Sequence, residues 1–191
     1  EFGMRRDQER NFGTGRESSQ EIFSDAFEFQ NLTASIGVVN ELNEHLSFRS
    51  NLGSAWRSPN MAELFSFGQH GFRTTFGLLR YDFNNEGEIR TDRVIPFSES
   101  GFEVERGFKW INQLDYAKHS SRHLVSFYSY YIENFVYLRP FSVIGTIRGP
   151  MPVFIYDQAD ALFVGFDYSW QENLNKNLTN KLGISYLWSR N

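Results

Sequence analysis

The chain has 191 residues and a formal net charge of −4, so it is long enough for one domain and has no basic excess to recruit nucleic acid. It contains no cysteine, which excludes disulfides, thiolate metal sites and thiol catalysis. Aromatic residues make up 17% of the chain and no apolar run approaches the roughly 20 residues of a transmembrane helix, a composition that favours β-strands.

In chain order, apolar and polar residues alternate with the period of two that predicts β-strands. The predicted strands cover residues 31–39, 45–57, 101–117, 123–137, 161–171 and 178–189, and residues 2–7 are read as the end of another. The alternation is still running at residue 189, and the first residues lack the apolar core of a signal peptide. We therefore expect an excerpt of a longer protein with about seven antiparallel strands.

Each predicted strand presents one apolar face and one polar, glycine-containing face. We expect the apolar set to point outward to lipid: Leu46, Phe48, Leu52, Leu162, Val164, Phe166, Leu182 and Ile184. We expect the polar set to point inward: Arg49, Asn51, Asp167 and Lys181. A strand that exposes only alternate residues to lipid keeps a low mean hydropathy, so the value of −0.46 is compatible with a membrane barrel.

The predicted connections alternate between short and long. Residues 40–43, 118–121 and 173–177 are expected to be short polar turns, and residues 11–23, 58–98 and 141–158 long loops. Strands of about 9–11 residues with short turns at one end and long loops at the other are typical of outer-membrane barrels. The pattern therefore predicts periplasmic short turns and extracellular long loops. Strand pairing is not expected to depend on residues 67–88.

Alternation alone also fits an antiparallel β-sandwich, in which one face packs against a second sheet. A carbohydrate-binding or adhesive sandwich module without transport is therefore the alternative. A passive porin, or a barrel with enzymatic activity, is a second alternative.

Several segments, in order along the chain, resemble signatures of TonB-dependent receptors. They are LGSAWRSPNMAEL at 52–64, SFGQHG at 66–71, ERG at 105–107, FY at 127–128 with FVYLRP at 135–140, and YDQADALFVGFD at 156–167. In the last segment Phe163 stands where the family usually has Leu, and Asp167 where it has Glu. The receptors that the chain resembles are active importers, with a barrel of about 22 strands closed by an N-terminal plug.

The resemblance implies that residues 1–191 are a partial barrel domain, without the plug, in the outer membrane. Its implied partners are outer-membrane lipid, the TonB complex through the absent plug region, and a small-molecule or chelate substrate, with no nucleic acid. Substrates of the family include iron-siderophores, other metal chelates and oligosaccharides. No cofactor, no metal site and no enzymatic activity are expected.

Two sets of site residues follow from the sequence. The positions that match family motifs are expected to be structural, although Arg57 could also face the lumen and pair with Glu63: Arg57, Pro59, Glu63, Leu64, Gln158, Asp160 and Gly165. Aromatic, Arg and His residues in the expected external loops are candidate ligand contacts: Phe65, Phe67, His70, Arg73, Tyr81, Arg90, Arg139 and Tyr156.

Overall fold

The computed structural model describes residues 2–16, 22–147 and 149–191, apart from the side chains of residues 9–16 and 22–27 and of His70. Seven long strands dominate it. They are β1 (Phe2–Arg16), β2 (Ile22–Asn43), β3 (Leu46–Arg57), β8 (Glu105–Lys118), β9 (Ser121–Thr146), β10 (Gly149–Asn175) and β11 (Leu178–Arg190). The remaining elements all lie between β3 and β8: α1 (Met61–Phe65), β4 (Phe67–His70), β5 (Arg73–Phe76), β6 (Asp82–Phe83), β7 (Ile89–Arg90) and α2 (Phe97–Ser100).

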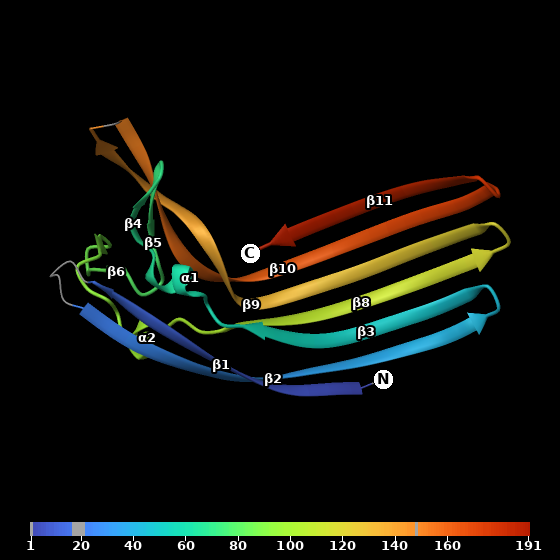
Figure 1. Ribbon diagram of the computed structural model, residues 1–191, viewed down its shortest axis with the longest axis horizontal. Coiled ribbons are helices and arrows are strands. Elements are labelled where there is room, and N and C mark those ends of the chain that lie inside the picture. Colours follow the sequence, from blue (N-terminus) through green and yellow to red (C-terminus); the bar gives the residue numbers. More distant parts are fainter. Residues whose placement is uncertain (1, 17–21, 148) are drawn as a thin grey trace.

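The long strands form one curved layer in which each strand pairs antiparallel with its neighbours in the chain (Figure 1). The predicted set of about seven antiparallel strands is therefore confirmed. The long strands do not pack face to face as two sheets, so the sandwich alternative is wrong for the described residues. No helix among the described residues is long and apolar enough to cross a membrane.

The strand register separates the two faces of this layer as the sequence predicted. One row across the sheet joins Leu52, Trp110, Ser129, Val164 and Trp188, and all the residues expected to point outward share its face. The next row begins at Asn51, and all the residues expected to point inward share that second face. We call these the apolar face and the polar face. Leu52, Leu182 and Ile184 are each about half exposed, so the apolar face is uncovered.

Three tight turns gather at one end of the sheet (Figure 1). They lie at residues 44–45, 119–120 and 176–177. Asn43 and Asn175 each accept a hydrogen bond from the backbone N–H two residues later, an arrangement that closes a turn without further contacts. The turns predicted at 118–121 and 173–177 are present. The turn predicted at 40–43 is wrong, because Asn40 and Glu41 still pair with β3 and the turn follows them.

Two of the three predicted long loops are strands instead. β1 and β2 remain paired as far as Arg16 and Ile22, so residues 11–16 and 22–23 of the first predicted loop belong to strands, and residues 17–21 lie outside the described part of the chain. Residues 141–158 likewise continue β9 and β10 up to Thr146 and Gly149. Backbone pairing carries these hairpins past the point where side-chain alternation ends. The long connection predicted at 58–98 is present and runs on to residue 104, but it is folded.

The extended β9–β10 hairpin bends away from the curved layer of long strands, which we call the wall, at the end where the β3–β8 connection lies (Figure 1). Irregular pairing between Ala159 and Ala161 marks the bend, where Asn134 on β9 has a φ of 56°. Beyond it, β5 pairs parallel with β10, and β4 pairs with β5. These short strands add to the edge of the extended hairpin, while the long strands pair with one another throughout, so the expectation that strand pairing does not depend on residues 67–88 stays a prediction.

Candidate functional site

The junction between the wall and the connection is organised by Arg57, the last residue of β3. Its guanidinium donates two hydrogen bonds of 2.7 Å to the carboxylate of Glu105, the first residue of β8. Another guanidinium nitrogen lies 2.7 Å and 3.0 Å from the two carboxylate oxygens of Glu63 on α1. The Arg57–Glu63 pair raised from the sequence is thus present, and paired N–H donors suit carboxylate oxygens in both position and charge.

Glu105 also connects to a third strand. Its side chain is only about 10% exposed, and Oε1 accepts a hydrogen bond of 2.6 Å from the backbone N–H of Val136 on β9. β8 pairs with β9 only as far as Arg106 and Glu133, so this N–H lies beyond the end of the strand pairing. A buried N–H needs a partner, and the carboxylate provides it.

Glu63 caps the short helix α1 in addition to pairing with Arg57. Its carboxylate accepts a hydrogen bond from the backbone N–H of Asn60, and Asn60 Oδ1 accepts one from the N–H of Glu63. This reciprocal capping box fixes the start of the helix. Pro59 and Leu64 are fully buried beside it. The family-matched segment thus fixes the path by which the chain leaves the wall.

The second group of motif residues secures the bend in the β9–β10 hairpin. The Gln158 amide donates to the carbonyls of Glu103 and Asn134 and accepts from the N–H of Glu103. Asp160 accepts from the N–H of Asn134 and from the hydroxyl of Tyr131. These bonds occupy the backbone groups that the irregular pairing leaves open. They also fix the end of the long connection to the bend.

Gly165, the remaining motif residue, lies under an aromatic ring. A Cβ built on it would come within 2.2 Å of the Tyr128 ring, which lies opposite it on β9. Glycine therefore lets the ring lie flat on the wall, a cross-strand arrangement in which an aromatic side chain covers a glycine.

A small core packs the connection onto the junction. Leu64, Leu78, Leu79, Val136 and Phe29 are buried together. Gly77 fits tightly against α1, since a Cβ there would lie 2.4 Å from the Leu64 carbonyl oxygen. The connection is therefore a packed cap at one end of the sheet.

This cap and the β9–β10 hairpin enclose a basin of about 350 Å³. It is lined by Tyr81, Asp82, Phe83, Arg93, Ile95, Glu99, Ser100, Phe102, Arg139 and Asp157. Arg139 pairs with Asp157 at 2.7 Å, and Asp82 pairs with Arg90 at 2.9 Å and Arg93 at 3.2 Å. The basin thus combines aromatic surface with paired charges, a lining suited to orienting a polar ligand.

Two ionisable groups of the basin have shifted pKa values. Hydrogen bonding to the Arg90 guanidinium, with a further bond from Arg93, lowers the pKa of the Asp82 carboxyl. Burial raises the pKa of the Tyr81 phenol, and the negative charge of Asp157 adds to the effect. The Tyr81 hydroxyl donates a hydrogen bond of 2.7 Å to the Tyr156 carbonyl.

The structure brings together only some of the candidate ligand contacts. Tyr81 and Arg139 line the basin. The Tyr156 carbonyl accepts a hydrogen bond from the Tyr81 hydroxyl, and Arg90 pairs with Asp82 of the basin lining. The sequence reasoning missed Asp157, although it stands beside Tyr156 in a quoted motif. Arg139 and Asp157 come together because β9 and β10 stay paired beyond residue 137, where the strand predicted from the alternation ends.

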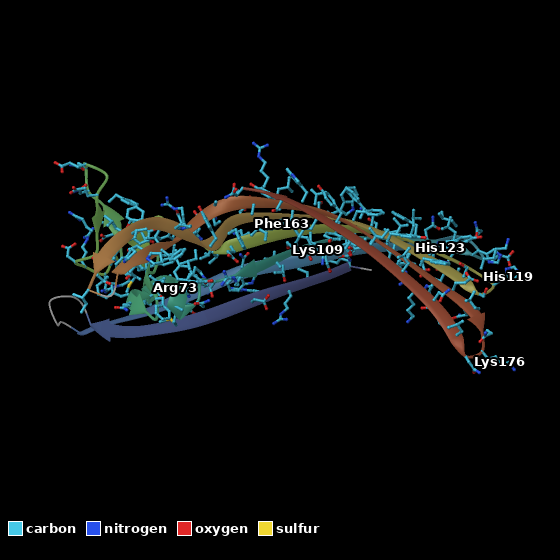
Figure 2. All side chains as sticks on the ribbon, turned by 90° about the horizontal axis from the view of Figure 1, so that it is seen from above. Arg73, Lys109, His119, His123, Phe163 and Lys176 are labelled. Carbon is cyan, nitrogen blue, oxygen red and sulfur yellow. The ribbon has the colours of Figure 1, made fainter. Side chains whose placement is uncertain are left out.

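The other candidates are placed differently. Phe65 packs on the small core. The guanidinium carbon of buried Arg80 lies 4.1 Å from the centroid of the Phe67 ring. Arg73 is exposed on β5, at the connection end of the molecule (Figure 2). His70 belongs to β4, but its side chain lies outside the described part of the chain. A role in ligand contact stays a prediction for all eight residues. Among the described residues, no three His, Asp or Glu side chains are grouped so that they could hold a metal ion.

Arg57→Met should lower the free energy of unfolding by about 1–3 kcal/mol, because it leaves the buried Glu105 carboxylate with fewer donors. Arg106→Met is the matched control: Arg106 is the neighbouring exposed arginine on the apolar face, and we expect a change within about 0.5 kcal/mol. Chemical denaturation of the complete protein in detergent measures both. Equal effects of the two substitutions would contradict the anchoring role of Arg57.

No protein-family model matches the chain, and no curated protein matches it. Solved structures match its fold. The copper transporter OprC superposes with a TM-score of 0.67 at 16% identity, over 100% of this chain and 26% of OprC. The Serratia marcescens hemophore receptor HasR gives 0.61 at 12%, over 100% of this chain and 30% of HasR. The siderophore receptor PirA from Pseudomonas aeruginosa gives 0.57 at 14%, over 98% of this chain and 34% of PirA.

These neighbours are outer-membrane TonB-dependent receptors. The chain therefore has the all-β fold of a segment of a TonB-dependent receptor barrel, as the sequence predicted. It spans roughly a third of their length or less, between 26% and 34% in these three.

Proposed function

We propose that the chain is a wall segment of an outer-membrane barrel that imports a nutrient with energy from the TonB complex. The observation that carries the proposal is the apolar face, which runs uncovered across the long strands while polar residues occupy the opposite face. An uncovered apolar surface of this extent is unfavourable in water and favourable against lipid hydrocarbon. Residues 1–191 would then be a partial barrel domain, with the plug elsewhere in a longer protein.

The aromatic side chains at the turn end support this placement. Tyr116, His123 and Tyr168 form a chain of ring contacts, with centroid distances of 6.0 Å and 6.2 Å. His123 Nδ1 lies 2.9 Å from the Tyr168 hydroxyl, and Trp170 Nε1 donates to Ser121. Rings with one apolar side and one hydrogen-bonding group suit the boundary between hydrocarbon and water. Figure 2 shows His119, His123 and Lys176 together toward this end.

The proposed import has a substrate class but no single substrate. The neighbours' own names include copper, a siderophore and a hemophore with heme, so the shared fold accommodates different cargo. We assign capture of an iron-siderophore, another metal chelate or an oligosaccharide to the cap and its basin, which Tyr81 and Arg139 line. No part of this proposal requires catalysis, a cofactor or nucleic acid. The TonB complex would act through the plug region.

Val164→Arg tests lipid exposure of the apolar face. Val164 lies in the middle of β10, and an arginine there should cost about 2–4 kcal/mol of barrel stability, as charges facing lipid do. Ser185→Arg is the matched control, because Ser185 is exposed on the polar face and pairs across the strands with Asp167. The free energy of unfolding in lipid vesicles measures both. A larger cost for Ser185→Arg would reverse the assignment of the faces.

Single cysteines test the sidedness of the barrel. Glu86→Cys lies at the tip of the β6–β7 hairpin, beside Gly87 with its φ of 79°, and Lys176→Cys lies in a tight turn at the opposite end. In intact cells that make the complete receptor, a membrane-impermeant maleimide should label Glu86→Cys and leave Lys176→Cys unlabelled until the outer membrane is opened. Labelling of Lys176→Cys alone would invert the topology. If neither cysteine is labelled after the outer membrane is opened, the protein does not lie in the outer membrane.

A further inference from the structure

The apolar face changes its chemistry in steps toward the turn end of the wall. Three successive rows of the strand register show the change across β8, β9, β10 and β11. The row farthest from the turns is Leu114, Val125, Tyr168 and Ile184. The next is Tyr116, His123, Trp170 and Leu182, and the last, which we call the charged row, is Lys118, Ser121, Glu172 and Asn180. The surface thus passes from mainly apolar side chains, through rings with polar groups, to charged side chains.

The charged row places opposite charges on two strands that flank β9. Lys118 is exposed on β8 and Glu172 is partly buried on β10, with Ser121 of β9 between them. Their backbones are therefore about 10 Å apart, two strand spacings. No ion pair in the described part of the chain joins these two side chains. A ligand that carries both charges could therefore contact both ends of the row.

The Glu172 carboxylate is held in place by the adjacent turn. It accepts a hydrogen bond from the Ser120 hydroxyl, and the Ser120 carbonyl accepts one of 2.9 Å from the backbone N–H of Asn173. A carboxylate has two oxygens and room for further donors. At the border of an apolar surface it is stabilised by N–H donors that replace water, above all by charged ones.

The row of rings is oriented by hydrogen bonds toward the charged row. Trp170 Nε1 donates to the Ser121 hydroxyl at 3.2 Å, and His123 Nε2 lies 3.2 Å from the same oxygen. The polar edges of these rings thus point toward the turns, and their apolar surfaces remain for hydrocarbon. The three rows follow the order of a lipid molecule from its chains to its headgroup.

Neither the plug nor the rest of the barrel would cover this surface. β8, β9 and β10 each pair with a long strand on both sides, so further strands of a barrel would be added beyond β1 and β11 (Figure 1). The rows belong to the apolar face, which points away from the lumen in the proposed function. Lipid is therefore the molecule that meets them.

We propose that the charged row binds the headgroup of a phospholipid with a primary amine, such as phosphatidylethanolamine. The lipid ammonium donates to the Glu172 carboxylate, the phosphate contacts the Lys118 ammonium, and the acyl chains lie along the two rows above. This inference rests on the proposed function, in which the apolar face meets lipid and the tight turns are periplasmic. It assigns the bound lipid to the periplasmic leaflet.

The test compares three phospholipids with the same dioleoyl chains. Native mass spectrometry of the complete receptor, freed of lipid in detergent, gives the dissociation constants of phosphatidylethanolamine, phosphatidylcholine and phosphatidylglycerol. Phosphatidylcholine has the same charges as phosphatidylethanolamine but no N–H donor, and phosphatidylglycerol has the phosphate without the ammonium. The wild type should bind phosphatidylethanolamine about twofold to fivefold more tightly than either of the others, the range of an exposed ion pair.

Two substitutions separate the ends of the headgroup. Glu172→Gln should bring the affinity for phosphatidylethanolamine to that for phosphatidylcholine, because the anionic acceptor is lost. Glu41→Gln is the matched control, an exposed carboxylate at the same end on the polar face, and should keep the wild-type preference. Lys118→Met should weaken all three lipids by about twofold to fivefold, because each has the phosphate. Lys181→Met, exposed on the polar face, should weaken none.

Heat-modifiable mobility verifies that each variant is folded. Equal wild-type affinities for phosphatidylethanolamine and phosphatidylcholine, or a preference retained in folded Glu172→Gln, would overturn the site. Equal effects of Lys118→Met and Lys181→Met would overturn the phosphate contact. Any of these results, together with the cysteine labelling expected above, removes this inference and leaves the proposed function standing. Inverted or absent labelling removes the proposed function whatever the lipids do.

Discussion

The carboxylate of Glu105 holds three strands where the regular wall ends. It receives the guanidinium of Arg57 from β3 and the backbone N–H of Val136 from β9, while it belongs itself to β8. Strand pairing alone cannot satisfy these groups, because β8 begins at Glu105 and β9 continues past it. Since Arg57 also bonds Glu63, the same contact fixes the capped turn of α1. The bend, the small core and the basin are all built outward from this point.

The wall and the cap obey different physical rules. In the wall, backbone pairing satisfies the polar groups of the main chain, and alternate side chains sort themselves between two faces. At the cap and at the bend of the β9–β10 hairpin, the chain leaves regular pairing, so side chains such as Gln158 and Asp160 at the bend must satisfy the backbone individually. A regular wall accepts many sequences with the same alternation. The cap depends on particular residues, and it is there that the segments resembling TonB-dependent receptors are concentrated.

The sequence predicted the wall well for this reason. Alternation identified both faces, and Lys176 and Asn177 fell within a predicted turn. The hairpins beyond residues 11 and 141 were missed because their backbones stay paired after the alternation fades. The motif at Arg57 indicated a pair with Glu63, but not the stronger tie to Glu105, which lies 48 residues away in the chain. The basin could not be predicted, because it forms only where the cap meets a hairpin that the sequence pattern had assigned to a loop.

Hydrogen exchange at a single amide tests the central role of Glu105 most directly. In the complete receptor, the Val136 N–H should exchange slowly, because a buried carboxylate accepts it, and Glu105→Ala should raise its exchange rate by roughly tenfold or more. The Phe127 amide, in the middle of the wall on the same strand, should keep its protection in the variant. Unchanged protection of Val136 in folded Glu105→Ala would contradict the account, because the bend would then be held without the carboxylate.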